Sequence, residues 1–253
     1  MKTTSNTILI TGGGSGIGRG LAEAFHALGN QVIIAGRRQR VLDETTRANP
    51  GMISAVLDIE DPAAIRAFAA QITEQRPALN VLINNAGISR IENLKAPQSD
   101  LAGVEAMITT NLLGPIRLTA ALLPHLQKQP RAAILNVTSG LAFVPLPQGP
   151  TYSATKAALH SYSVSLRVQL RDTPVEVIEI IPPYVQTELG GSKQASDPRA
   201  MPLKEYIAET MQILETQPEA VENCVERAQS LRFAEATGSF DKAVEMLAQL
   251  AFD

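Results

Sequence analysis

The chain has 253 residues, of which 45% are hydrophobic and 19% are charged, and 22 Lys and Arg residues against 25 Asp and Glu residues give a net charge of -3. This weakly acidic balance provides no basic field for nucleic acid, and no run of 18 or more residues is free of charges, Gly and Pro, so neither nucleic-acid binding nor membrane insertion is expected. The one cysteine, Cys224, has no partner for an intrachain disulfide, and no signal-peptide pattern precedes Thr7, so a cytoplasmic protein is expected.

Short runs rich in Val, Ile and Leu recur along the chain and alternate with helix-like stretches. Runs that are apolar at nearly every position are typical of strands covered on both faces, as in a parallel sheet between two layers of helices. The predicted strands are Thr7–Thr11, 31–35, 52–57, Leu79–Asn84, Ala132–Val137 and Val175–Ile181. The pattern therefore predicts an α/β chain with a doubly wound parallel sheet, and with no linker or repeat to divide it, a single domain over residues 1–253.

A glycine-rich turn, TGGGSGIG at 11–18, joins the first predicted strand to the first predicted helix. The backbone N–H groups and the dipole of such a helix N-terminus can receive a pyrophosphate. A tight turn needs glycine for steric reasons alone, but the position of this one inside a β-α-β unit favours nucleotide binding. A Walker A loop would place a Lys where Arg19 stands, so the expected ligand is a dinucleotide rather than ATP.

The second predicted strand is followed by Arg37 and Arg38, where an NAD site normally places an Asp or Glu against the ribose 2′-hydroxyl. An arginine can pair bidentately with a 2′-phosphate, so NADP(H) is expected in preference to NAD(H). Arg37, the first residue after the strand, is the main candidate and Arg38 the second. The alternative is a solvated arginine pair, because Arg40 makes the whole stretch basic.

Tyr152 and Lys156 lie four residues apart where a helix should begin, so both side chains project from one face. An ammonium in that position can stabilise a phenolate. Ser139 follows the fifth predicted strand, at the sheet edge where doubly wound folds bind their ligands. A Tyr-x-x-x-Lys pair arises by chance often enough that its setting, between Ser139 and the glycine turn, must supply the specificity.

Together these motifs resemble the classical short-chain dehydrogenases/reductases. The resemblance rests on TGGGSGIG at 11–18, NNAG at 84–87, Asn111, Ser139 and YSATK at 152–156, and it covers roughly residues 7–190. The runs NLLGPIRLTAALLPHL and SGLAFVP and the C-terminal region further resemble a subgroup labelled after a D-alanyl-lipoteichoic-acid operon protein. The family resemblance implies a Rossmann fold and hydride transfer between a nicotinamide and a carbonyl or alcohol.

The resemblance assigns catalytic roles to four residues. Tyr152 would exchange a proton with the substrate oxygen, with its ionised form favoured by Lys156, which would also bind the nicotinamide ribose. Ser139 would donate a hydrogen bond to the substrate oxygen. Asn111 would hold a water that connects Lys156 to solvent, in a helix that Gly114 and Pro115 make irregular; alternatively it bonds its own helix.

The resemblance also implies a set of cofactor contacts. The glycine turn would bind the phosphates, Asp58 and Ile59 the adenine, Asn85 to Gly87 the adenosine side, and the segment after the sixth strand the nicotinamide amide. Pro183 departs from the family's usual glycine and stiffens the start of the substrate loop. The predicted cofactor residues are Gly12, Ser15, Gly16, Ile17, Gly18, Arg37, Arg38, Asp58, Ile59, Asn85, Ala86, Gly87, Tyr152, Lys156, Pro182, Val185 and Thr187.

Apolar side chains follow both Ser139 and the sixth predicted strand. They predict a pocket for an apolar aldehyde, ketone or alcohol, although Arg90 could reach an anion. His26, His125 and His160 show no metal-ligand spacing and the chain has neither HExxH nor CxxC, so no metal is predicted and all three are interpreted as structural or solvated.

The last part of the chain, residues 182–253, is predicted to form a substrate loop and a helical tail. Residues 204–215 and 219–250 are predicted as helices, with Gly238 as a break. The seventh strand usual in the resembled family is therefore expected to be missing. Family tetramers use that end for one interface, so a homodimer through the helices around 111–126 and from Tyr152 is expected.

Two other functions remain open from the sequence. A dinucleotide-binding sensor could use the same fold without turnover, because a fold does not prove catalysis. An epimerase or dehydratase would use the nicotinamide only transiently. The intact Ser139, Tyr152 and Lys156 set favours the NADP(H)-dependent reductase or dehydrogenase.

Overall fold

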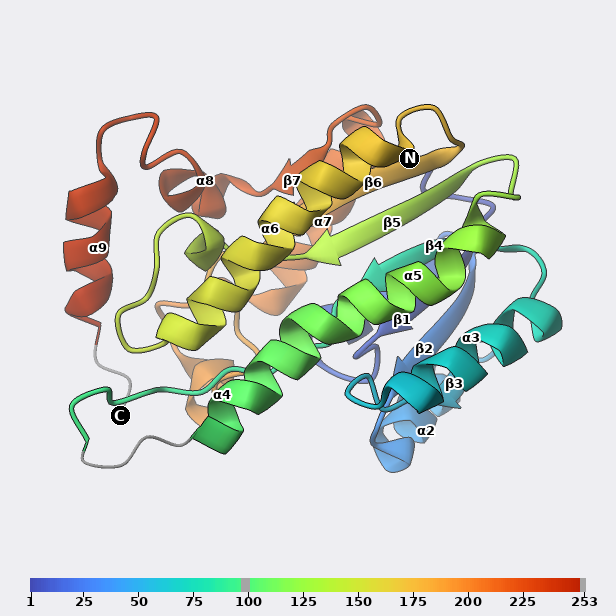
Figure 1. Ribbon diagram of the computed structural model, residues 1–253, viewed down its shortest axis with the longest axis horizontal. Coiled ribbons are helices and arrows are strands. Elements are labelled where there is room, and N and C mark those ends of the chain that lie inside the picture. The colour runs from blue at the N-terminus through green and yellow to red at the C-terminus, as the bar shows by residue number, and fades with distance from the viewer. Residues whose placement is uncertain (97–100, 251–253) are drawn as a thin grey trace.

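The computed structural model describes residues 1–96 and 101–250. Its centre is a seven-stranded sheet with the order β3-β2-β1-β4-β5-β6-β7, and every neighbouring pair of strands is parallel (Figure 1). The predicted doubly wound sheet is therefore confirmed. The strands are β1 (Thr7–Thr11), β2 (Gln31–Gly36), β3 (Ile53–Val56), β4 (Leu79–Asn84), β5 (Ala132–Val137), β6 (Val175–Ile181) and β7 (Glu222–Cys224).

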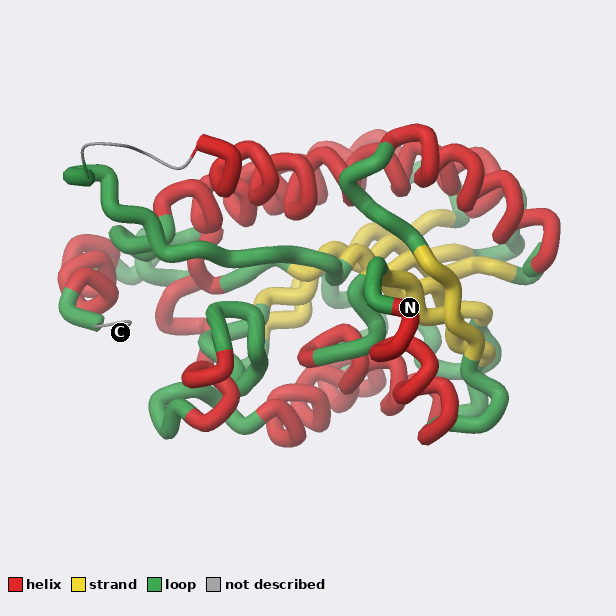
Figure 2. The backbone as a smooth tube through the Cα atoms, turned by 90° about the horizontal axis from the view of Figure 1, so that it is seen from below, coloured by secondary structure: helices red, strands yellow, loops and turns green. Residues whose placement is uncertain are grey.

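Helices cover both faces of the sheet, which lies between them as a layer in Figure 2. Phe25 and Tyr206 belong to the core on one face, and Phe68, Leu118 and Leu166 belong to the core on the other. Burial of these side chains from water holds the helices on the sheet. The helices are α1 (Gly16–Ala27), α2 (Gln39–Ala48), α3 (Pro62–Gln75), α4 (Leu101–Ile108), α5 (Gly114–Leu126), α6 (Pro150–Leu170), α7 (Leu203–Thr216), α8 (Glu226–Arg232) and α9 (Phe240–Ala248).

The C-terminal region differs from the prediction over residues 219–225, which the sequence predicts as helix but which contain a strand, so that the helical part begins at Glu226. The seventh strand expected to be missing is present as β7, which pairs with β6 from Glu179 to Ile181. It has three residues, Glu-Asn-Cys, so it shows no apolar run, and its conformation comes from pairing with β6 rather than from local preference. The predicted break at Gly238 is confirmed, because this residue has a φ of +69° between α8 and α9. Residues 251–253 of the predicted tail lie outside the described residues.

The helix between β4 and β5 changes its winding in the middle. Thr109–Leu113 forms a π-helical turn, η1, between α4 and α5, which confirms the irregularity predicted near Gly114. By length and composition Leu101–Leu126 is apolar enough to cross a membrane, with a mean hydropathy of 1.3. Here, however, Leu118, Leu122 and Leu126 pack into the core beneath α5, so this helix covers the sheet.

Candidate active site

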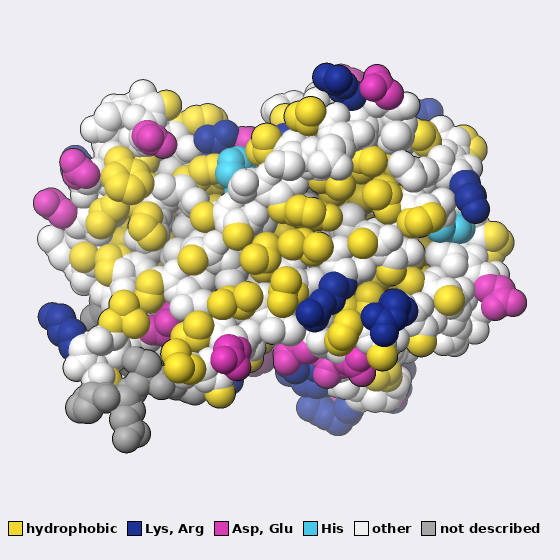
Figure 3. All heavy atoms as spheres, viewed as in Figure 1, with side chains coloured by type: hydrophobic (Ala, Val, Ile, Leu, Met, Phe, Trp, Pro, Cys, Tyr) yellow, Lys and Arg dark blue, Asp and Glu magenta, His cyan; other side chains and the backbone are white. Residues whose placement is uncertain are grey.

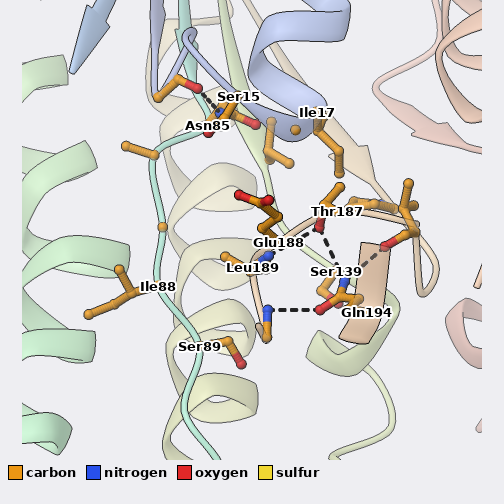
Figure 4. A pocket seen from close by; sticks show the side chains of 18 of the residues that line it. Ser15, Ile17, Asn85, Ile88, Ser89, Ser139, Thr187, Glu188, Leu189 and Gln194 are labelled. Atoms are coloured by element: carbon orange, nitrogen blue, oxygen red, sulfur yellow. Dashed lines mark hydrogen bonds between the residues drawn. The ribbon is translucent and has the colours of Figure 1, made fainter. Parts of the chain in front are cut away.

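A cavity of about 1410 Å³ opens along the carboxyl edge of the sheet, next to the ends of β1, β2, β4, β5 and β6. It extends from the glycine turn to the loop after β6 (Figure 4). Its volume exceeds the roughly 300–1,000 Å³ of a typical ligand pocket, which leaves room for a dinucleotide and a substrate together. All the predicted site residues line this cavity except Gly18, Asp58 and Asn111.

Ser139, Tyr152 and Lys156 come together at the end of β5. All three are buried, with exposed fractions of 6%, 7% and 4%. Ser139 hydrogen-bonds the Tyr152 hydroxyl. The Lys156 ammonium lies 5.6 Å from the centroid of the Tyr152 ring and donates to the carbonyl of Val137 at 2.8 Å. A hydroxyl pair and a cation therefore meet in one site, as their spacing on α6 and after β5 predicts.

The ionisation of Tyr152 differs from the prediction. Burial raises the pKa of Tyr152 to about 12, and the hydrogen bond from Ser139 lowers it by less. Burial also lowers the pKa of Lys156 from 10.5 to about 8. The site on its own therefore favours a neutral phenol, because removing either charge from water outweighs the attraction between them. A neutral phenol is the form that can donate a proton.

The buried Lys156 should make the stability of the chain depend on pH. Below pH 8 the folded chain carries the buried Lys156 ammonium. Because burial lowers the pKa of this group from 10.5 to about 8, keeping it charged reduces the free energy of unfolding by about 3 kcal/mol. Between these two values the unfolded chain binds more protons, so the free energy of unfolding rises with pH. Lys156→Met should abolish this rise in chemical denaturation at pH 7, 8.5 and 9.5.

The measurement has to stay below pH 10, because the raised pKa of Tyr152 makes stability fall with pH above that value. Lys204→Met is the matched control, since Lys204 is exposed at the start of α7. The same rise in the Lys156→Met protein as in the parent would contradict the assignment.

Asn111 lies in η1 behind Lys156 and does not line the cavity. Its Oδ1 accepts from the backbone N–H of Ile88 at 2.8 Å, and its Nδ2 donates to the carbonyl of Ile88 at 2.9 Å and to Thr155 at 3.2 Å. These contacts run to the segment after β4 and to α6, so the alternative that Asn111 only bonds its own helix is wrong. The π-helical turn points the amide at these partners.

The glycine turn has the geometry that a pyrophosphate needs. Gly16 has a φ of +53°, and a Cβ there would stand 3.4 Å from the side chain of Thr187 across the cavity. Ser15 is the N-cap of α1 but makes no capping hydrogen bond, so the first N–H groups of the helix are available to an anion. Gly18 serves packing instead, because a Cβ there would lie 2.3 Å from Nδ2 of Asn85. The residues of this turn fit a dinucleotide.

The two arginines after β2 are held differently. Arg37 pairs with Glu60 at 2.8 Å. The Glu60 carboxylate also accepts from Thr110 at 2.8 Å. Arg38 instead donates to the hydroxyl of Ser15 in the glycine turn at 3.1 Å. We therefore expect Arg38 rather than Arg37 to bind a 2′-phosphate, because Arg37 already has a carboxylate partner.

Of the residues expected on the adenosine side of a cofactor, Ile59, Asn85, Ala86 and Gly87 line the cavity and Asp58 does not. The Asp58 carboxylate accepts from the backbone N–H of Glu60 at 3.0 Å and so caps its own turn. Asn85 donates through Nδ2 to the carbonyl of Thr11 at 2.9 Å, which joins the ends of β1 and β4.

The sequence did not single out Gln194, which organises the loop after β6. Its amide nitrogen, Nε2, donates to the carbonyl of Val185 at 2.8 Å and to Thr187 Oγ1 at 3.2 Å. Its Oε1 accepts from the backbone N–H of Gly190 at 2.8 Å. In Figure 4 Thr187 and Gln194 face Ile88 and Ser89 across the pocket. A lone Gln in a loop carries no periodic signal that would reveal this role.

An apolar wall closes the cavity beside Tyr152. α8 and α9 pack on the loop that follows Ser139, around a small core containing Val144 and Leu146. The apolar side chains of this wall that line the cavity are Leu141, Leu146, Leu231, Leu247 and Leu250. The sequence predicted apolar side chains after Ser139 here, but not Leu231 of α8, Leu247 of α9 and Leu250 just after α9, which only the packing of the C-terminal region brings to the cavity.

Comparisons with known proteins agree with this geometry. The model of the short chain dehydrogenase family matches residues 6–198. The chain is 42% identical over 250 residues, 98% of each chain, to the uncharacterized oxidoreductase DltE of Bacillus subtilis (strain 168).

Solved structures resemble the chain over most of its length. A short chain dehydrogenase from Burkholderia cenocepacia J2315 in complex with NADP has a TM-score of 0.81 at 26% identity, covering 99% of this chain and 100% of that one. A 3-ketoacyl-(acyl-carrier-protein) reductase from Brucella melitensis complexed with NADH has a TM-score of 0.77 at 25% identity, covering 90% and 100%. Similar structures therefore hold either cofactor.

Proposed function

The chain belongs to the short-chain dehydrogenase/reductase family, in which it is similar to the DltE type, and we propose that it is an NADP(H)-dependent oxidoreductase acting on an apolar carbonyl or alcohol. The observation that carries this proposal is the buried group of Ser139, Tyr152 and Lys156 on a cavity that also contains the glycine turn. We place the activity in the cytoplasm.

Tyr152, Ser139 and Lys156 have different roles in carbonyl reduction. Tyr152 holds the proton that the substrate oxygen receives, and burial keeps it on the phenol at neutral pH. Ser139 donates a hydrogen bond to the same oxygen as negative charge develops there. The Lys156 ammonium, close to the Tyr152 ring, stabilises the phenolate left after proton transfer. The glycine turn would hold a nicotinamide dinucleotide, which would supply the hydride for carbonyl reduction or accept one from an alcohol.

In this proposal Arg38 and Ser15 produce the preference for NADP(H). Their side chains are hydrogen-bonded to each other at the glycine turn. Arg38→Ala should weaken NADPH binding by about 10- to 100-fold, the equivalent of one charge-assisted hydrogen bond, and leave NADH binding nearly unchanged. Calorimetric titration with both cofactors measures this. Arg37→Ala should have the smaller effect, because Glu60 already pairs with Arg37; a larger loss in Arg37→Ala would reverse the assignment.

The substrate class follows from the apolar wall. Leucines from the loop after Ser139, from α8 and from the end of α9 surround the space next to Tyr152, which suits an aldehyde, ketone or secondary alcohol with an apolar chain or ring. The deciding experiment is NADPH and NADH oxidation with a panel of apolar aldehydes and ketones, beside direct binding of both cofactors. Turnover with NADPH supports the proposal, and tight NADPH binding without turnover on the whole panel supports a sensor instead.

We further propose that the protein is a homodimer through α4, α5 and α6. Exposed apolar side chains lie on α4 and α6, with Val168 58% exposed on α6 and Leu101 64% exposed on α4. Figure 3 shows apolar side chains gathered over the region where α5 and α6 lie in Figure 1. Because β7 is present, the reason for excluding a tetramer from the sequence no longer holds.

Light scattering should therefore give a mass near two chains for the parent and near one chain for Val168→Glu, because a buried carboxylate destabilises an apolar interface. Leu28→Glu is the matched control, since Leu28 is 46% exposed at the end of α1, on the other face of the sheet. A mass near four chains for the parent would count against the dimer.

A further inference from the structure

Glu179 is a carboxylate in the middle of the sheet. It lies on β6, is 0% exposed, and interrupts a strand whose other central residues are buried and apolar. Removing a carboxylate from water is costly unless it is paired and hydrogen-bonded, and an apolar side chain would suit this position in a parallel sheet. Glu179 does not line the cavity. The free-energy cost of burying its charge must therefore be offset by the groups that it contacts.

Both carboxylate oxygens of Glu179 have a partner. Oε1 accepts from the hydroxyl of Thr138 at 2.7 Å, and Oε2 lies 2.7 Å from Nδ1 of His160 on α6. A carboxylate only accepts hydrogen bonds, so Nδ1 of His160 carries the proton in this contact. Glu179 therefore connects the residue just before Ser139 to the helix that carries Tyr152 and Lys156.

The contact belongs to a series between α6 and residues 137–139, which end β5 and lead into the segment 140–142 that packs against α6. Tyr152 and Lys156, one turn apart on α6, meet Ser139 and the carbonyl of Val137. His160, one further turn along, reaches Thr138 through Glu179. Three successive residues at the end of β5 are thus held by three successive turns of α6.

A second carboxylate completes the surroundings of His160. Ligand atoms of His160, Glu179 and Glu222 lie within 4.8 Å of one another, a spacing that would also suit a metal ion. Arg232 already binds Glu222 through Nε at 2.7 Å and Nη2 at 2.8 Å, with its guanidinium 4.4 Å from the Phe143 ring centroid. The guanidinium already supplies the positive charge beside Glu222 that a cation would bring, and His160 is paired with Glu179.

We propose that Glu179 and His160 are positioning residues for the reaction proposed above: through Thr138 they hold the end of β5 so that the Ser139 hydroxyl meets Tyr152. The physical reason is orientation. The Thr138 backbone N–H donates to the carbonyl of Ile180 on β6 at 2.9 Å. The Thr138 hydroxyl donates to Glu179 at 2.7 Å, and the Ile180 carbonyl is a more distant acceptor for it at 3.3 Å. Releasing the side chain frees the next peptide to rotate, and a small displacement of a catalytic hydroxyl is costly.

The first test needs no substrate, so its outcome is independent of the proposed function. In protein labelled with 13Cζ-tyrosine, the Tyr152 signal is assigned by its loss in Tyr152→Phe, and it reports the hydrogen bond with Ser139. Glu179→Gln should move this signal in the parent but not in a Ser139→Ala background. A Tyr152 signal that Glu179→Gln leaves in place would overturn the inference, whether or not the protein turns over any substrate.

The second test is kinetic and uses a carbonyl that the parent reduces. Glu179→Gln should lower kcat by about 10- to 100-fold while the dissociation constant for NADPH stays within about twofold. In the Ser139→Ala background the same change should have little further effect, because it acts through Ser139. Losses that multiply in the double variant would show a general structural role and overturn the inference.

Two further variants keep the tests interpretable. Thr138→Val removes the hydroxyl that Glu179 binds and preserves the side-chain shape, so it should reproduce both effects of Glu179→Gln and it serves in its place if that variant does not fold. Thr138→Ser restores the hydroxyl and should recover most of kcat. Glu176→Gln is the matched control, because Glu176 lies on the same strand, is exposed and pairs with the N-terminal ammonium.

Discussion

Tyr152→Phe should lower turnover by about 10³-fold or more and leave the affinity for NADPH within about twofold of the parent. The substitution removes one oxygen and preserves the ring that packs in the site. Loss of a general acid typically lowers the rate by about 10²- to 10⁴-fold. Among the described residues of the cavity, only Ser139 has a hydroxyl bonded to Tyr152, so no other hydroxyl is in place to supply the proton. Steady-state kinetics and calorimetry with NADPH measure the two effects.

The matched control for this prediction is Tyr162→Phe. Tyr162 also lies on α6, is half-buried, and bonds Thr119 on α5 rather than a residue of the cavity. It should retain kcat. Equal loss of turnover and cofactor binding in Tyr152→Phe would contradict the assigned role, because it would point to a collapsed site.

The pH dependence of the parent follows from the same two groups. Burial holds the pKa of Tyr152 near 12, so the phenol that donates the proton is present throughout the neutral range. The pKa of Lys156 is lowered to about 8. Carbonyl reduction should therefore be level at neutral pH and decline as the pH rises through about 8, where the ammonium that stabilises the phenolate is lost.

Ser139→Ala should lower kcat by about 10²- to 10³-fold, the usual effect of removing one donor to a developing oxyanion. The Ser139 hydroxyl also lowers the pKa of Tyr152 against the larger effect of burial, so its loss makes the phenolate still harder to form. The KM for NADPH should change little. Single-turnover measurements with saturating NADPH separate the chemical step from binding.

Ser163→Ala is the control for this second prediction. Ser163 is fully buried on α6, donates to the carbonyl of Leu159 at 2.8 Å and accepts from Asn136 at 2.9 Å, away from the cavity. It should lower stability, because a buried partner is left unsatisfied, but retain kcat. Similar losses of kcat in both variants would mean that Ser139 acts only through the packing of the site.

The framework of the fold is readable from local patterns. The six predicted strands are present, with ends that differ by at most one residue, because continuous apolar runs are typical of strands buried on both faces. The break at Gly238 and the irregular helix near Gly114 also follow from residue type. β7 does not, because three residues carry no period and this strand exists by pairing with β6.

The same division applies to the site. The spacing of Tyr152 and Lys156 and the glycine turn predict a dinucleotide site with an acid–base pair, since one turn of helix and one tight loop determine which side chains lie together. The choice between Arg37 and Arg38 depends on Glu60, and the ionisation of Tyr152 depends on burial. In the sequence Glu179 is one charged residue in an apolar strand, and only the structure shows its contacts with His160 and Thr138. Such features arise from contacts between residues far apart in the chain, whose geometry no local pattern contains.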